Sequence, residues 1–409
     1  MKSESVDVLV IGAGPAGSVA AAIVKKYGLN VKMVEKLKFP RFVIGESLLP
    51  RSMEAFEDAG FLPALKASGF QEKFGAKFVQ GEKICDFNFS DQFTKGWSWT
   101  WQVPREDFDL LLADEVQRMG IPLEFETTVT DIKFDGTDSV TTVVDKNGKA
   151  QQINAKFIID ASGYGRVIPQ LFNLDKPSNL PPRKTLFTHI LDTKRQEYDE
   201  PNRIIIIDHA PSVWIWVIPF SNGFTSVGFV GDINFFEQFE GTLEERLRQA
   251  ISTNKHISQR FKDATYRFEP RTIEGWSKTT DKFFGDGFVL TGNVTEFLDP
   301  IFSSGVTLAV SSSQLAAHLV AKQLTGKEVD WQKEYTDKMI FGVDTFRTYV
   351  MAWYDGTLQK IFFAENQNEE IKSKICSVLA GYVWDTDNYY VKKHQTGIKT
   401  LASFIQNTK

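Results

Sequence analysis

Three glycines near the N-terminus have the spacing of a phosphate-binding turn. Gly12, Gly14 and Gly17 lie between an apolar, β-branched run at residues 6–11 and a helix-like run at residues 18–26. In such a unit the first glycine allows the tight turn, the second lets the backbone approach a pyrophosphate, and the third lets the helix pack against the strand. The N–H groups and the dipole of the helix start favour an anion. The motif predicts a dinucleotide site, but it does not separate FAD from NAD.

An acidic residue follows the second strand-like run, where a ribose contact requires one. Residues 31–34 are mostly apolar, and Glu35 comes directly after them. Its carboxylate can accept hydrogen bonds from ribose hydroxyls, which favours an adenosine with a free 2′-OH over a 2′-phosphate. A glycine-rich turn without a ligand is the alternative, but it does not explain the acid at this distance. We therefore expect a cofactor site that contains Gly12, Gly14, Ala16, Gly17, Glu35 and Lys36.

Two further candidates lie well beyond this unit. Arg105 stands at the start of a predicted helix, after Pro104 and before two acidic residues. It could reach a phosphate or a ribityl chain, and a surface ion pair is an equally good interpretation. Asp160 ends a second apolar run, residues 156–159, which leads into a glycine-containing turn. The nucleotide-binding fold is therefore expected to resume more than a hundred residues after its second strand.

Composition and charge exclude several classes of function. The 409 residues carry a net charge of −5, which argues against a nucleic-acid partner and gives no basic stripe for a membrane surface. No apolar run reaches membrane-spanning length, so we expect no membrane insertion and no targeting segment. Two cysteines exclude a disulfide framework and suit a reducing, cytoplasmic location. The five histidines show no metal-ligand spacing, so no metal site is expected.

The order of strand-like and helix-like runs predicts an α/β fold with interleaved parts. We expect a Rossmann-like FAD-binding domain, an antiparallel β-sheet substrate lobe and a C-terminal helical region. Segments far apart in the sequence would meet at one site, which is typical of flavin oxidoreductases that bind FAD in an extended form. The expected boundaries are 1–185 with 270–325 for the FAD-binding domain, 186–269 for the substrate lobe and 326–409 for the helical region.

Two motifs in the second half of the chain make a family resemblance specific. Residues 213–219 contain the pattern W-x-W-x-I-P, formed by Trp214, Trp216, Ile218 and Pro219. Residues 299–306 read D-P-I-F-S-S-G-V. Both motifs resemble those of flavin-dependent halogenases, in particular the branch that acts on phenols and pyrroles. These belong to the wider p-hydroxybenzoate-hydroxylase-like group of FAD oxidoreductases.

The resemblance implies a reaction and a set of residues. In the family, reduced FAD, oxygen and a halide, chloride or bromide, give hypohalous acid, which passes to a lysine in a K-x-G sequence that Lys73 matches. The alternative for Lys73 is a solvated surface lysine. The tryptophan face would keep the organic substrate from the flavin, although core packing alone also explains it. The implied halide contacts are Ser304 and Gly305, and the implied flavin contacts are Asp160, Gly292, Asn293, Gly305 and Val306.

Other functions share most of these features. An FAD-dependent aromatic monooxygenase, a polyprenyl-type reductase and a flavin-binding protein without turnover all remain open. Asn293 stands where the family usually has aspartate, so an amide replaces a carboxylate there. The resemblance implies that a separate flavin reductase supplies reduced FAD, and the lack of a second dinucleotide motif in the sequence is compatible with this. The implied substrate is a small aromatic molecule, either free or attached to a carrier protein.

Overall fold

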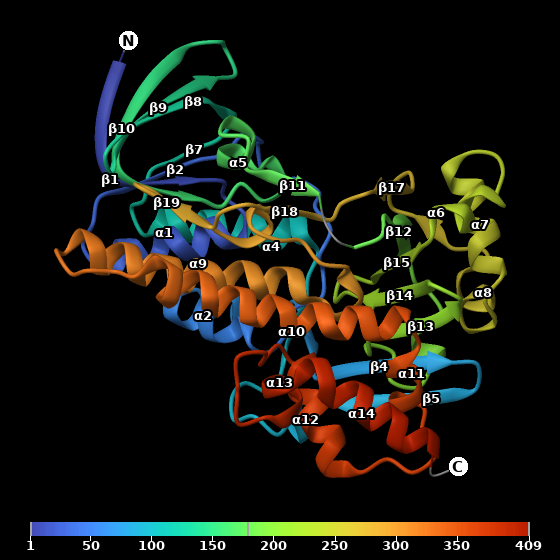
Figure 1. Cartoon of the computed structure of the whole chain (residues 1–409). Coiled ribbons are helices and arrows are strands. Elements are labelled where there is room, and N and C mark those ends of the chain that lie inside the picture. The colour runs from blue at the N-terminus through green and yellow to red at the C-terminus, as the bar shows by residue number, and fades with distance from the viewer. Residues whose placement is uncertain (1, 178–179, 408–409) are drawn as a thin grey trace.

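The glycine turn lies at the carboxyl end of a strand inside a parallel sheet. The computed structural model describes residues 2–177 and 180–407. In its first sheet β1 is central, with β10 and β2 parallel to it on either side, and β20 and β7 lie next outward. Helices α1 and α9 lie side by side beneath these strands (Figure 1). The element bounds are β1 (Lys2–Ile11), β2 (Val31–Val34), β7 (Leu123–Glu124), β10 (Ala150–Asp160), β19 (Phe284–Gly285), β20 (Phe288–Leu290), α1 (Pro15–Lys26) and α9 (Ser304–Leu324).

An antiparallel meander joins the same sheet beside β10. β8 (Thr127–Asp135) pairs with β9 (Asp138–Asp145), and β9 pairs with β10. Besides α1 and α9, the helices near the first sheet are short, apart from the one that starts at Arg105. Their bounds are α2 (Ser52–Ala59), α3 (Leu62–Ala67), α4 (Arg105–Arg118) and α5 (Val167–Leu171).

The second sheet is antiparallel in its middle, as the alternating pattern predicts. Apolar side chains on one face of β14, such as Ile215, pack against helices α7 and α8, whereas Trp214 and Trp216 point to the other face. The bounds are β12 (Lys184–Leu191), β13 (Ile205–Ala210), β14 (Val213–Pro219), β15 (Phe224–Gly231), β16 (Thr265–Tyr266), β17 (Arg271–Glu274), α6 (Ile233–Glu237), α7 (Leu243–Ser252) and α8 (Lys255–Phe261).

A hairpin from the first part of the chain extends this second sheet. β4 (Gly75–Gln80) pairs parallel with β13, and β5 (Lys83–Asn88) pairs with β4. The boundaries expected from the sequence place residues 75–88 with the FAD-binding part, so their position in the second sheet differs from that expectation. The pairing of β4 with β13 joins segments more than a hundred residues apart, and a strand's own residues do not specify so distant a partner.

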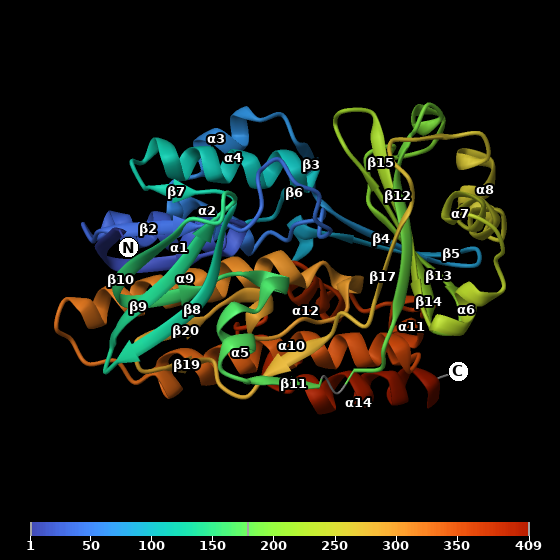
Figure 2. The ribbon, with the colours of Figure 1, turned by 90° about the horizontal axis from the view of Figure 1, so that it is seen from above.

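The C-terminal region is helical, as predicted, and its helices α12 and α14 lie below β4 and β5 (Figure 1). Figure 2 shows the two sheets at opposite ends of the molecule, with α10 running alongside α9 between them. The remaining bounds are α10 (Asp337–Tyr354), α11 (Thr357–Phe362), α12 (Glu369–Leu379), α13 (Tyr389–Lys392), α14 (His394–Asn407), β3 (Gln71–Lys73), β6 (Thr100–Gln102), β11 (Asp175–Pro177) and β18 (Lys278–Thr280). Within the described ranges, no helix is long and apolar enough to cross a bilayer.

Candidate active site

The glycine turn is as tight as its spacing predicts. Gly12 has a φ of +98°, and a Cβ there would lie 2.6 Å from the carbonyl oxygen of Ala161. A Cβ on Gly17 would lie 1.9 Å from the carbonyl oxygen of Gly12. Helix α1 begins after Gly14 without a side-chain cap, so the N–H groups of its first turn are available to a ligand. This backbone fits a pyrophosphate, which needs close approach and several N–H donors.

Glu35 is buried at the end of β2 and faces the same turn. Its Oε2 accepts a hydrogen bond from the backbone N–H of Ala13, and its Oε1 accepts one from the N–H of Leu37, both at 2.9 Å. Each carboxylate oxygen has a further lone pair for a ribose hydroxyl. Glu35 therefore also fixes the glycine turn to the second strand, a role that the sequence pattern did not reveal.

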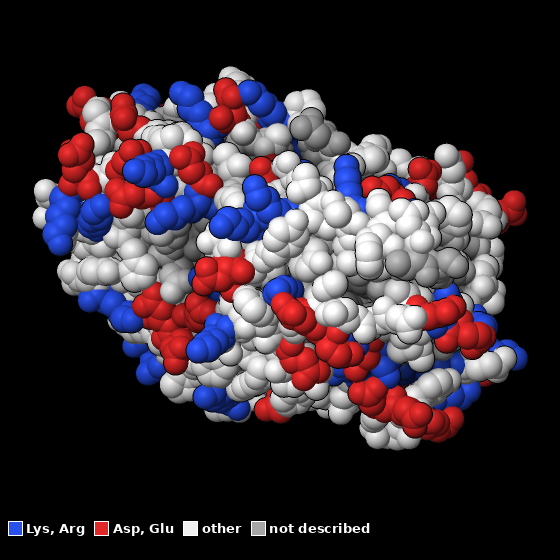
Figure 3. Space-filling model, turned by 60° about the horizontal axis from the view of Figure 1, so that its bottom comes forward, with Lys and Arg blue, Asp and Glu red and all other residues white. Residues whose placement is uncertain are grey.

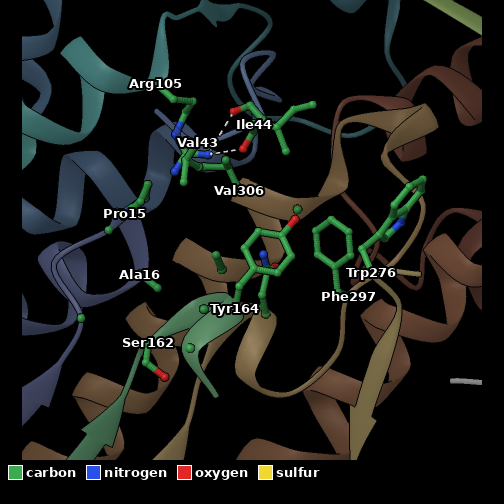
Figure 4. A pocket seen from close by; sticks show the side chains of 18 of the residues that line it. Pro15, Ala16, Val43, Ile44, Arg105, Ser162, Tyr164, Trp276, Phe297 and Val306 are labelled. Atoms are coloured by element: carbon green, nitrogen blue, oxygen red, sulfur yellow. Dashed lines mark hydrogen bonds between the residues drawn. The ribbon is translucent and has the colours of Figure 1, made fainter. Parts of the chain in front are cut away.

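A cavity of about 470 Å³ runs from the glycine turn to the second sheet. Tyr164 and Phe297 lie side by side along it, with Arg105 and Ile44 across from them (Figure 4). The predicted site residues that line it are Gly12, Gly14, Ala16, Glu35, Lys36, Arg105, Trp214, Trp216, Ile218, Asn293, Gly305 and Val306. The other predicted site residues lie outside its lining: Gly17, Lys73, Asp160, Pro219, Gly292 and Ser304.

Asp160 shapes a loop beside the cavity. Its carboxylate is fully buried, and it accepts hydrogen bonds from the backbone N–H groups of Ser162, at 3.0 Å, and Ile168, at 2.8 Å. Burial raises the pKa of this carboxyl. Residues 161–165 of the loop line the cavity, so Asp160 acts on the site by holding their backbone.

Arg105 is buried and anchors the segment that borders the cavity. Its guanidinium makes a two-bond ion pair with Asp109, at 2.8 and 3.0 Å. Its Nη1 also donates to the carbonyl oxygens of Ile44, at 2.9 Å, and Gly45, at 3.3 Å (Figure 4). Arg105 does form an ion pair, but the prediction that it lies on the surface is wrong, because only 7% of Arg105 is exposed.

The turn at Gly292 and the start of α9 lie next to the cavity, which Asn293, Gly305 and Val306 line. Gly292 donates its N–H to Ser312 Oγ at 2.9 Å, and the carbonyl of Asn293 accepts from Arg166 Nη1 at 2.9 Å. The side chain of Ser304 is buried away from the cavity. Ser303 lines the cavity instead, in the left-handed conformation that precedes α9.

The tryptophans of β14 form one wall of the cavity, and a residue from the C-terminal region holds one of them. Trp214 Nε1 donates to the hydroxyl of Tyr354 at 3.0 Å, and that hydroxyl donates to Asp299 Oδ2 at 2.8 Å. Burial raises the pKa of Asp299 to about 6. Trp216 Nε1 donates to Ser226 Oγ at 3.0 Å. No sequence motif marks Tyr354, because its role depends on how α10 packs.

Lys73 is buried on the far side of the cavity wall. It ends β3, which pairs with β6, and only 3% of it is exposed, so the surface alternative is wrong. Its Nζ donates to Ser47 Oγ at 2.8 Å and to the carbonyl oxygen of Leu48 at 2.7 Å. Burial, with a smaller effect of the nearby Arg203 charge, lowers the pKa of Lys73 to about 7. Ser47 lines the cavity and so separates it from the amine.

Comparison with known families decides which cofactor the glycine turn serves. The model of the FAD binding domain family matches residues 5–338. The chain belongs to this FAD-binding family. The close backbone approach at Gly12 and Gly17 and the Glu35 carboxylate fit the two phosphates and the ribose of FAD. The described residues contain no cluster of histidine, cysteine and acidic side chains that could hold a metal ion.

Relatives of this FAD-binding chain include halogenases. It is 26% identical over 393 residues, 94% of each chain, to a 1H-pyrrole-2-carbonyl peptidyl-carrier protein brominase of Pseudoalteromonas luteoviolacea (strain 2ta16). A triple mutant of the flavin-dependent brominase Bmp2 has 25% identity and a TM-score of 0.81, with 98% of each chain covered. A flavoprotein/dehydrogenase from Cytophaga hutchinsonii has 62% identity and a TM-score of 0.97, covering 99% of this chain and 100% of its own. These likenesses confirm the predicted fold class and the resemblance to flavin-dependent halogenases.

Proposed function

We propose that the chain is a flavin-dependent halogenase acting on an activated aromatic ring. When bound in this site, reduced FAD would supply the chemistry by which oxygen oxidises chloride or bromide to hypohalous acid. A separate flavin reductase is the proposed source of reduced FAD. Lys73 is the proposed residue that receives the hypohalous acid and presents the halogen to the substrate.

The observation that carries the proposal is the position of the Lys73 amine. A lysine buried with an unaltered pKa would be protonated at neutral pH and would have no lone pair to react with a halogen. With a pKa of about 7, a large fraction of Lys73 is neutral and nucleophilic at pH 7. Ser47 stands between this amine and the cavity, so an oxidant formed in the cavity meets the lysine only after crossing the wall.

Two features of the cavity support the same reaction. Trp214 and Trp216 line the end towards the second sheet, where their bulk would keep an arene away from the flavin. The uncapped start of α9, next to Ser303 and Gly305, faces the cavity and favours a halide by about 0.3–1 kcal/mol. Gly305 lines the cavity, whereas Ser304 does not, so we propose Gly305 as the nearer of the two predicted halide contacts.

The proposed substrate is a phenol or a pyrrole, either free or attached to a carrier protein. The carrier alternative rests on the brominase relative, which acts on a pyrrole attached to a peptidyl-carrier protein and matches over 94% of its length. Nucleic acid is not a proposed partner, since basic side chains are interspersed with acidic ones on the face seen in Figure 3. The cytoplasm is the proposed location, because Cys85 and Cys376 are both free thiols.

Mass spectrometry of products tests the proposal. The protein is supplied with FAD, a flavin reductase, oxygen, bromide or chloride, and a panel of phenols and pyrroles. A halide-dependent gain of one halogen is expected, and Lys73→Ala should keep bound FAD but lose the product. Lys66→Ala, which removes a lysine near Trp97 instead, serves as the matched control.

Other products would support the alternatives. A gain of one oxygen without halide dependence would identify an aromatic monooxygenase, and saturation of double bonds in a polyprenyl substrate would identify a reductase. FAD binding without any turnover would leave a flavin-holding protein. The flavoprotein/dehydrogenase neighbour makes these assays necessary, because its 62% identity exceeds that of the halogenases.

A further inference from the structure

The segment that separates the cavity from Lys73 is fixed on both sides of Ser47. The Glu46 carboxylate is paired with Nε2 of the buried His189, and the Glu46 carbonyl accepts from the N–H of Val103 at 2.7 Å. On the other side, the N–H of Leu48 donates to the carbonyl of Trp101 at 3.1 Å. These contacts hold the backbone on both sides of Ser47, and the hydrogen bond from Lys73 Nζ holds its side chain. It is 4% exposed, and it touches the cavity on one side and the amine on the other.

The hydrogen bonds of Lys73 suit a neutral amine about to react. A neutral amine has two N–H groups and one lone pair, whereas an ammonium has three N–H groups. Within the described part of the chain, Nζ has two hydrogen-bond acceptors, Ser47 Oγ and the carbonyl of Leu48. Both N–H groups of the neutral form are thus satisfied, and the lone pair is left over on a nitrogen that lies 5.3 Å from the centroid of the Phe89 ring. The lowered pKa of Lys73 agrees with this count.

Ser47 is also placed to pass on a proton. Its Oγ accepts from Lys73, and no acceptor for its own hydroxyl hydrogen occurs among the described residues. Because Ser47 lines the cavity, that hydrogen can be donated to a small molecule arriving there.

We propose that Ser47 is a catalytic residue that relays a proton while hypohalous acid halogenates Lys73. The inference rests on the proposed halogenase function. The lone pair of Nζ attacks the halogen, an N–halogen bond forms and the O–halogen bond breaks. One N–H proton moves to Ser47 Oγ as the serine proton moves to the departing hydroxyl, which leaves as water. The lysine becomes a haloamine, and the serine is regenerated.

The test measures haloamine on the protein in the absence of an aromatic substrate. Protein, FAD, flavin reductase, oxygen and bromide are mixed, quenched at set times and desalted, and the retained oxidising equivalents are titrated with 5-thio-2-nitrobenzoate. Ser47→Ala should slow haloamine formation about 100-fold or more, the lower end of the range for loss of a proton-transfer group. Ser47→Thr keeps the hydroxyl and should stay within about 3-fold of the unmodified protein. Ser47→Gly is a second hydroxyl-free variant should Ser47→Ala fail to accumulate.

A measurement on the flavin-free protein separates the relay from an effect on basicity. The pKa of Lys73 is followed by NMR of ¹³C-labelled lysine ε-carbons, assigned with Lys73→Arg. Loss of the Ser47 acceptor should lower this pKa further, which would speed a reaction controlled by the neutral fraction alone. A slower reaction together with a lower pKa therefore supports the relay. Ser52→Ala is the control, because Ser52 is a buried serine that bonds to Thr307 instead, and it should change neither value.

The remaining outcomes are distinct. Haloamine formation by Ser47→Ala at the unmodified rate would overturn the relay and leave the halogenase proposal intact. Halogenated product without any retained haloamine in the unmodified protein would also overturn it, because no proton would then leave Nζ. If the unmodified protein gives neither haloamine nor a bromide-dependent product, the proposed function itself fails.

Discussion

The glycine turn consists of six consecutive residues, 12–17, and the placement of its backbone follows from φ angles and from the lack of a Cβ atom on Gly12 and Gly17. In the amine pocket, which we define as Lys73, Ser47 and Leu48, a strand end meets a loop twenty-five residues earlier in the chain. The turn binds through conformations that the local sequence permits. The pocket depends on burying an amine against partners that only the assembled fold brings near.

This difference determines how substitutions affect the glycine turn and the amine pocket. The turn leaves no room for a Cβ on Gly12 or Gly17, but none of its residues carries a charge that must be removed from water. The amine pocket instead holds an ionisable group, the amine of Lys73, and burial destabilises its charged form. A substitution in the turn should therefore act through steric overlap, and the effect of one in the pocket should depend on pH.

The largest effect is expected from Gly17→Val. Its Cβ would lie 1.9 Å from the carbonyl oxygen of Gly12, a backbone atom that cannot move without opening the turn. FAD binding, followed by flavin absorbance after gel filtration, should be lost. Gly28→Ala is the control, since a Cβ there meets nothing within 4 Å, and the positive φ should cost about 1 kcal/mol without affecting FAD. Normal FAD binding by Gly17→Val would contradict the account of the turn.

Truncation of Trp216 should open the cavity at its end towards the second sheet. Trp216 is 5% exposed and packs so closely on Gly228 that a Cβ there would lie 2.2 Å from the indole. Trp216→Ala should lower the free energy of unfolding by about 3–5 kcal/mol, measured with urea. Products should shift from halogenated towards oxygenated arenes as the cavity opens. An unchanged product ratio would show that the tryptophan is packing alone, and Trp97→Ala is the comparison outside the cavity.

Lys73→Met should sharpen the comparison through pH. The pKa of Lys73 falls from 10.5 to about 7 on folding, so between these values the unfolded chain binds more protons. The free energy of unfolding of the unmodified protein then rises with pH through this window. Below pH 7 the buried amine destabilises the protein by its full amount. Lys73→Met lacks this cost, so its free energy of unfolding should exceed that of the unmodified protein by more at pH 6 than at pH 10. The change in this difference between the two pH values should be on the order of 3 kcal/mol. Urea unfolding at both values measures this, and a pH-independent difference would contradict a lowered pKa.

The smallest effect is expected from Tyr354→Phe, which removes the hydroxyl between Trp214 and Asp299. Two buried polar groups would lose a partner, so the free energy of unfolding should fall by about 1–3 kcal/mol. The pKa of Asp299 should rise further above 6, because the hydroxyl bond lowers it now. Tyr389→Phe, at a half-exposed position, is the matched control and should be neutral. Equal stability of the two variants would show that the Tyr354 hydroxyl does not stabilise Trp214 and Asp299.

The sequence by itself determined the features whose cause is local. The glycine spacing, the acid after the second strand and the alternation that puts Trp214 and Trp216 on one face all follow from φ preferences and from the period of two of a strand. The K-x-G motif at Lys73 follows from the local sequence as well, and its role stays a prediction. These expectations match the turn, the Glu35 position and the tryptophan wall in the structure.

Only the tertiary structure decided which side chains face the cavity and which groups are buried together. Asp160 bonds to its own loop, Ser304 points away, and Arg105 is inside, because each orientation depends on packing between distant elements. Ser47 and Tyr354 carry no motif and become visible through their hydrogen-bond partners alone. The pKa of Lys73 belongs to this second group, since desolvation is a property of the surroundings and not of the residue.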